Sequence, residues 1–218
     1  DEAPGAEHAY SNIGFGVLGL LVEEITEKPL YQYTKEHIFD PLQMDRTGWL
    51  LSEVDTGAHA RPYFYVTAEN VEMLRESDLR NGLLPALPDP DDGYYVSTCL
   101  YSFPNYPDGL VRSSVEDLSH FLIMMLKEGE FRGKMILKKE TVRRMLTPQL
   151  EKNEQQGLCW YFTGYEAVWG HEGGDPGITT GLYFNAELNL GVIVLQNSNE
   201  GSIRDMALPL YLAGKEME

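Results

Sequence analysis

The spacing of apolar residues predicts helices along the first two thirds of the chain. In residues 13–27 and again in residues 115–127, apolar side chains recur every three or four positions, which is the period of an amphipathic helix. Pro29 suits the first turn of a second helix that extends to about Phe39, because the N–H that proline lacks has no partner in that turn. Shorter helices are expected at about 67–80, 138–147 and 202–213.

Capping residues support two of these helices. Asn12 stands before the first one, and its side-chain oxygen can accept a hydrogen bond from an unpaired backbone N–H. Ser114 and Asp117 have the spacing of a capping box at the start of the helix over residues 115–127. We therefore expect Asn12 and Ser114 to be the N-cap residues.

Beyond about residue 150 the apolar positions lose the helical period, and aromatic and β-branched residues become frequent. This composition is typical of strands, which we expect at 157–163, 178–185 and 191–196, with residues 187–190 as a hairpin turn. Helices followed by antiparallel strands and a last helix predict an α+β fold. We assign residues 1–218 to one domain, helical and looped to about 150 and mainly strands from about 151.

The middle of the chain, residues 50–112, is expected to be irregular apart from the short helix at about 67–80. Prolines interrupt any longer element there, at positions 85, 88, 90, 104 and 107. Long loops in a compact protein are often the walls or lids of functional sites.

Charge and cysteine content narrow the possible partners. Acidic residues outnumber basic ones 34 to 17, so a net charge of -17 repels phosphate backbones, and we expect no nucleic-acid partner. No apolar run is long enough to span a membrane. Cys99 and Cys159 are too far apart for a C-x-x-C motif. We expect two buried thiols, with a single disulfide as the alternative.

Two motifs match known patterns only in part. Residues 14–19 read G-x-G-x-x-G, but a turn-like segment stands where a dinucleotide site needs a strand, so we expect small residues for close helix packing. His171 and Glu172 begin an H-E-x-x-H pattern that lacks its second histidine. We therefore expect neither a cofactor nor a metal.

Two three-residue motifs remain, Tyr10-Ser11-Asn12 and His171-Glu172-Gly173. Penicillin-recognising enzymes with an active-site serine carry S-x-x-K, S-D-N and K-T-G in that order. In one branch the second motif is Tyr-x-Asn and the third can be His-x-Gly. With the flanking residues 10–49, 107–149 and 169–201, the chain resembles the serine β-lactamase/D-alanyl-D-alanine carboxypeptidase superfamily, in its class C-like branch. The resemblance covers nearly the whole chain and is least distinctive over residues 50–100.

The resemblance implies roles for the residues of both motifs. Tyr10 would belong to the general base, Asn12 would bind the substrate's amide, and His171 would replace the lysine of the third motif as a hydrogen-bond donor. Gly174 would supply an oxyanion-hole N–H. Further candidates for substrate binding are Gly173 and Asn197. The chemistry would be an acyl-enzyme reaction without a cofactor, on a β-lactam, a D-amino-acid peptide or an ester, in a periplasmic or extracellular location.

The first motif of the family is missing, because no lysine has a serine or threonine three positions before it. We therefore expect the chain to be the C-terminal part of a larger serine hydrolase that is inactive alone, with Tyr10 titrating near its ordinary pKa. A truncated sheet would expose an edge and apolar surface, so we also expect self-association or a need for the N-terminal part. The alternative is a non-catalytic binding module with the same fold.

Overall fold

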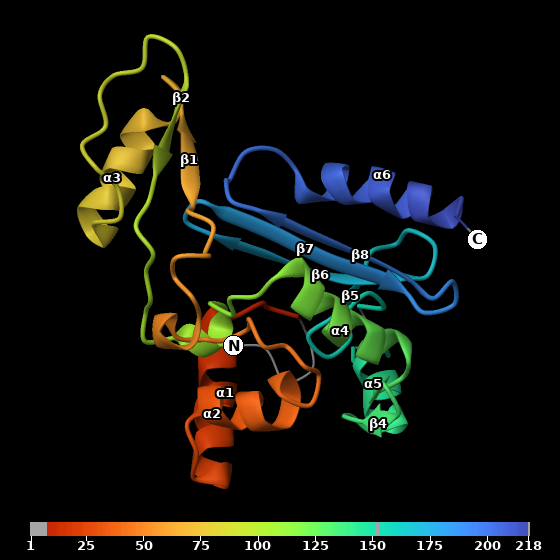
Figure 1. Ribbon diagram of the computed structural model, residues 1–218. Coiled ribbons are helices and arrows are strands. Elements are labelled where there is room, and N and C mark those ends of the chain that lie inside the picture. The colour runs from red at the N-terminus through yellow and green to blue at the C-terminus, as the bar shows by residue number, and fades with distance from the viewer. Residues whose placement is uncertain (1–7, 151–152, 218) are drawn as a thin grey trace.

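A four-stranded antiparallel sheet organises the C-terminal part of the chain in the computed structural model, which describes residues 8–150 and 153–217. The strands lie in the order β5 (Tyr161–Phe162), β6 (Val168–Asp175), β7 (Ile178–Asn185) and β8 (Leu190–Gln196). Helix α6 (Ile203–Lys215) covers one face and α4 (Val115–Leu126) the other (Figure 1). The α+β fold class is therefore as predicted.

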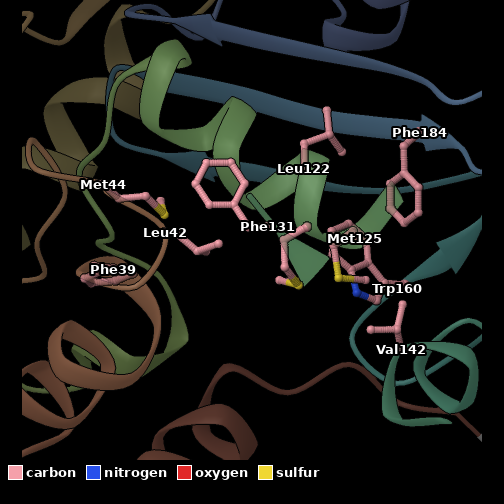
Figure 2. Close-up of a cluster of buried hydrophobic side chains, with 10 residues drawn as sticks. Phe39, Leu42, Met44, Leu122, Met125, Phe131, Val142, Trp160 and Phe184 are labelled. Atoms are coloured by element: carbon pink, nitrogen blue, oxygen red, sulfur yellow. The ribbon is translucent and has the colours of Figure 1, made fainter. Parts of the chain in front are cut away.

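Side chains of β7 pack into two hydrophobic clusters, one on each face of the sheet, because successive side chains of a strand point to opposite faces. Tyr183 packs on the α6 side with Val192 and Tyr211, and Phe184 packs on the α4 side with Trp160 and Leu122. Figure 2 shows the α4-side cluster, where side chains from α4 meet residues from segments far apart in the sequence. The main core thus lies between α4 and the sheet.

The first helix, α1 (Asn12–Thr26), begins one residue before the predicted start at residue 13, and its cap also differs from the prediction. Ser11 is the N-cap, and its hydroxyl accepts a hydrogen bond from the backbone N–H of Gly14 at 3.0 Å. Asn12 is already the first helical residue, so its side chain is not a cap. Because Ser11 takes that role, Asn12 is left free to line the site described below.

The second helix begins one residue later than expected. Pro29 is the cap residue before α2 (Leu30–Thr34), rather than part of the first turn. The helix then widens into a π-helical turn, η1 (Lys35–Phe39). Leu30 and Phe39 are buried, so the segment is held by packing at both ends.

The face of α1 that contacts the protein is its glycine face. A Cβ on Gly16 would lie 1.8 Å from Oδ1 of Asn105, and one on Gly19 would lie 2.6 Å from Pro107. The proline ring cannot move aside, so the approach at Gly19 requires glycine, and the helix packs closely through the last two glycines of the G-x-G-x-x-G motif. The apolar residues on the helix are more than half exposed instead: Ile13, Val17, Leu18, Leu20, Leu21 and Ile25.

The middle of the chain is more ordered than the sequence indicates. Strands β1 (Tyr63–Val66) and β2 (Tyr94–Ser97) pair antiparallel, and α3 (Val71–Asn81) begins later than its predicted start. This part of the chain also contains two short 3-10 helices, η2 (Leu51–Glu53) and η3 (Tyr106–Asp108). The expected helix is therefore present, but the two strands were not expected, because tyrosine-rich strands of only four residues carry no visible period.

The remaining elements follow α4. Ser114 caps that helix as predicted, and its hydroxyl accepts from the N–H of Asp117 at 3.1 Å. The Asp117 carboxylate instead accepts from the backbone N–H of Arg46 and from the hydroxyl of Thr47. A hairpin of β3 (Glu130–Phe131) and β4 (Lys134–Met135) and the helix α5 (Lys139–Met145) complete the region.

Three further expectations need correction. β5 covers only Tyr161–Phe162, because a bend at residues 158 and 159 interrupts the predicted strand over 157–163. β8 already begins at Leu190, inside the predicted turn. Cys99 and Cys159 are both exposed free thiols, rather than buried ones or a disulfide.

Candidate active site

A wide cleft of about 1850 Å³ opens between the start of α1, the strand β6, the loop that precedes β1 and the loop that follows β2. This volume exceeds the range of about 300–1,000 Å³ that is usual for small-molecule sites. The cleft lining includes all six residues that the sequence singled out: Tyr10, Asn12, His171, Gly173, Gly174 and Asn197. The fold therefore brings together motifs that stand at opposite ends of the chain.

Tyr10 and His171 lie next to each other in this cleft. Their ring centroids are 6.5 Å apart, although the two residues are separated by most of the sequence. Phe15 from the first turn of α1 contacts the Tyr10 ring with centroids 5.7 Å apart, and Tyr161 of β5 stands 6.4 Å from His171. The phenol and the imidazole thus share one aromatic-lined wall.

The strand that carries His171 is paired on only one side at this point. β5 pairs with β6 at Trp169 and Gly170 and goes no further, whereas β7 pairs with the whole of β6. From His171 to Asp175, one edge of β6 therefore has no strand partner among the described residues. Backbone groups on such an edge are available to a ligand.

Glycines make this edge accessible. Gly173 and Gly174 are exposed, and a Cβ on Gly174 would meet no atom within 4 Å. A Cβ on Gly173 would lie 2.6 Å from Oγ1 of Thr180. The first glycine is thus required by packing, while the second leaves open space beside the backbone in which a ligand can approach closely.

The side chain of Glu172 is the centre of a hydrogen-bonded cluster that connects β6 to β5, β7 and α6. Its Oε1 accepts from Tyr161 Oη at 2.8 Å, Tyr183 Oη at 2.6 Å and Arg204 Nε at 2.5 Å. Burial acts to raise the pKa of Glu172, but the hydrogen bonds from Arg204 and the two tyrosines hold that pKa below its ordinary value. Sequence reasoning missed this cluster because its members stand on four separate elements.

The two asparagines have different surroundings. The backbone carbonyl of Asn12 accepts from Nδ2 of Asn105 at 3.2 Å, which ties the start of α1 to the loop before η3. The side-chain amide of Asn197 donates to the carbonyl of Arg61 at 2.9 Å. Asn197 is therefore partly occupied with holding the chain that leads into β1.

Burial and nearby acidic groups both act on the pKa of Tyr10. Burial raises the pKa of Tyr10, and the neighbouring Asp108 and Cys159 raise that pKa further. Burial also raises the pKa of Asp175, with a further increase from Asp108 and an opposing effect of Arg112. The expectation that Tyr10 titrates near its ordinary pKa therefore needs correction, because burial and the two neighbours raise that pKa. The phenol is protonated near neutrality, and this chain alone does not activate it as a base.

The site contains no arrangement typical of a metal centre. Across residues 8–150 and 153–217, no group of three histidine, cysteine, aspartate or glutamate side chains is placed to hold a metal ion. In the same ranges, no helix combines the length and apolar character needed to cross a bilayer.

Comparison with known proteins identifies the family of the chain. A family model described as Beta-lactamase matches residues 1–214. The chain is 24% identical over 221 residues to the N-acetylmuramyl-L-alanine amidase of Bacillus subtilis, a match that covers 94% of this chain and 47% of the relative.

Two solved structures share the fold. The octameric penicillin-binding protein homologue from Pyrococcus abyssi has a TM-score of 0.72 at 24% identity, over 98% of this chain and 44% of its own. The D-amino acid amidase from Ochrobactrum anthropi, in complex with D-phenylalanine, has a TM-score of 0.71 at 20% identity, over 99% of this chain and 60% of its own. This chain therefore spans about half the length of these proteins.

Proposed function

Since this chain belongs to the beta-lactamase family, we propose that it forms one side of the active site of an acyl-transferring hydrolase. The nucleophilic serine and its lysine would come from residues outside the printed sequence, which contains no S-x-x-K motif. The observation that carries the proposal is the contact of Tyr10 with His171 beside the glycine-lined free edge of β6.

The chemistry assigns a step to each of these groups. The serine hydroxyl attacks the substrate carbonyl and passes its proton towards Tyr10, which acts as part of the general base. Because burial and Asp108 raise the pKa of Tyr10 in this chain, a cation beside the phenol is needed to favour its ionised form. The lysine of the missing motif would supply that cation.

The remaining groups stabilise and orient. An N–H of the β6 edge at Gly174 would donate to the oxyanion of the tetrahedral intermediate, and His171 would donate to the substrate or to Tyr10. Asn12 would bind the amide of the substrate. When the intermediate collapses, the C–N bond breaks, the leaving amine takes up the proton held at Tyr10, and the acyl group stays on serine as an ester. Water then hydrolyses this ester, which releases the carboxylic acid and restores the serine hydroxyl.

The relatives favour an amide as the bond that is cleaved. One is named as an amidase of N-acetylmuramyl-L-alanine and one as an amidase of D-amino acids. We therefore place amides ahead of the β-lactams and esters that share the same motifs.

The first experiment uses this chain alone. The chain is incubated with a β-lactam or a fluorophosphonate and weighed by mass spectrometry. We expect no covalent adduct, because no serine stands in the S-x-x-K context. A stoichiometric adduct on a serine of this chain would refute the proposed division of the site.

The second experiment restores the missing part. The upstream gene sequence is read, and a segment that encodes S-x-x-K is expressed together with this chain. We expect an acyl-enzyme, with Tyr10→Phe slowing its formation about 10²–10⁴-fold, the range for loss of a general base. Tyr95→Phe is the matched control, since Tyr95 is exposed and does not line the cleft.

A non-catalytic module remains the second candidate, and the missing S-x-x-K motif favours it. A start codon directly before Asp1 in the gene would support the module. An upstream S-x-x-K would support the hydrolase.

A further inference from the structure

We propose that the cleft selects amides in which a positively charged amino group stands beside a large apolar side chain, and that it disfavours substrates with a carboxylate. This inference rests on the proposed function, because it concerns the substrate of the same cleft. It would separate an aminoacyl amide from a β-lactam or a peptide with a free C-terminal carboxylate.

Aromatic rings supply the apolar part of the cleft. Phe15 lies beside Tyr10, with ring centroids 5.7 Å apart. Tyr101 and Phe103 form a second aromatic surface, with centroids 6.5 Å apart and ring planes inclined by 16°. All four rings line the cleft, as does the exposed Leu18 of α1. A ligand side chain placed here gains by removing apolar area from water.

Carboxylates outnumber cations in the lining. Six carboxylates line the cleft, from Asp45, Glu53, Asp55, Asp108, Glu172 and Asp175, and its two guanidiniums are those of Arg46 and Arg112.

Both guanidiniums already have partners. Arg46 pairs with Glu116, and Arg112 donates to the carbonyls of Trp49, Leu110 and Tyr101. These bonds occupy three of the N–H groups of Arg112, and its positive charge acts on Asp175, whose pKa it lowers. Around Asp175 the balance is therefore two carboxylates, Asp108 and Asp175, to one guanidinium.

Asp175 stands where a substrate amino group would lie. It follows Gly174 directly, and its carboxylate has no hydrogen-bond or ion-pair partner among the described residues. A Cβ on Gly109 would lie 3.7 Å from Oδ2 of Asp175, so the Asp108–Gly109 segment lies next to this carboxylate.

Asp108 reinforces the negative charge at this position. Its Oδ2 accepts a hydrogen bond from Nδ2 of Asn105 at 2.6 Å, and it raises the pKa of both Tyr10 and Asp175. If the scissile carbonyl sits at Gly174, an amino group on the adjacent carbon faces Asp175 and Asp108. A carboxylate at the same place would meet two like charges.

The test is binding to this chain, which needs no nucleophile. Four probes are titrated by NMR at low ionic strength: phenylalaninamide, N-acetylphenylalaninamide, N-acetylphenylalanine and alaninamide, with both enantiomers of each. We expect phenylalaninamide to bind about tenfold more tightly than the neutral N-acetyl amide, and the anionic N-acetylphenylalanine to bind most weakly of the aromatic probes. Alaninamide should bind at least about tenfold more weakly than phenylalaninamide, because it lacks the ring.

Single variants separate the two parts of the recognition. Asp175→Asn should lower the preference for phenylalaninamide over its N-acetyl form by roughly threefold or more, and added salt should do the same. Phe103→Ala should weaken the aromatic probes and leave alaninamide unchanged. Asp92→Asn is the control, because it removes one negative charge outside the cleft lining and should change nothing.

Two outcomes overturn the inference: equal or tighter binding of the neutral or anionic probe, and no binding of any probe at millimolar concentration. A charge preference without an acyl-enzyme in the complemented protein would retain the recognition and reject the hydrolase. An acyl-enzyme without the preference would retain the hydrolase and reject the recognition.

Discussion

Helices α1 and α4 have the same apolar periodicity, but the apolar face of α4 is buried and that of α1 is exposed. Leu122, Met124 and Met125 of α4 are at most 5% exposed, whereas Val17, Leu21 and Ile25 of α1 are 59%, 52% and 73% exposed. The α4 stripe packs on the sheet and on α5, and α1 packs through its glycines instead. The period of a sequence thus reports that a helix has an apolar face, but not what covers that face.

The contrast also explains where the candidate site lies. The end of α1 that carries Tyr10 and Asn12 opens into the cleft, and the exposed apolar face continues away from it along the same helix. Exposed apolar faces of this kind mark interaction surfaces. We propose that another copy of this chain packs on this face, which is the association that the Leu21→Glu experiment below tests.

The largest predicted effect compares apolar residues of the two helices, one buried and one more than half exposed. Met125→Ala should lower the free energy of unfolding by about 2–5 kcal/mol, because it leaves a cavity in the core between α4 and the sheet. Leu21→Ala should change it by less than about 0.5 kcal/mol, since the side chain is already in water. Denaturant unfolding of both variants measures the difference, and equal losses would contradict the contrast.

The second prediction concerns self-association through α1. Leu21→Glu places a charge on the exposed apolar face and should weaken association of this chain about tenfold, as measured by light scattering over a concentration series. Glu24→Gln, on an exposed position of the same helix, is the control for charge change. A wild-type chain that stays monomeric at every concentration would remove the basis for this prediction.

Much of the fold could be predicted because strand composition and cap spacing are visible over a few neighbouring residues. The strand over residues 178–185 is found as β7 with the same bounds, and Ser114 caps α4 as its spacing indicates. β6 was missed as a periodic strand because its glycines interrupt the pattern. Those same glycines are the ones that keep its edge accessible at the site.

The site was predictable in part. The resemblance identified Tyr10 and His171, and the fold brings them together. The acidic groups around them, Asp108 and Asp175, have no motif and become neighbours only through the folding of η3 against the end of β6. Contacts between distant loops of this kind leave no signal in a single sequence.

The third prediction compares the two caps. Ser114→Ala should cost about 1 kcal/mol of unfolding free energy, because the N–H of Asp117 loses its acceptor at the start of a core helix. Ser11→Ala removes a hydrogen bond of similar length, 3.0 Å, from the exposed end of α1. Its effect on global unfolding should be smaller, with faster hydrogen exchange confined to the first turn of α1. A larger global loss for Ser11→Ala would show that α1 unfolds together with the core.

The smallest predicted effect is a gain in stability. The folded protein raises the pKa of Asp175, first through burial and then through Asp108, so ionisation at neutral pH costs more in the folded state than in the unfolded one. Asp175→Asn removes that cost and should raise Tm at pH 7 by about 1–3 °C. Because the folded state binds the proton more tightly, the wild-type chain gains stability relative to the variant as pH falls through the raised pKa. The difference in Tm should therefore shrink on acidification and vanish below the pKa of the unfolded chain. A lower Tm for the variant at pH 7, with Asp92→Asn unchanged, would mean that Asp175 holds the end of β6 in place rather than straining it.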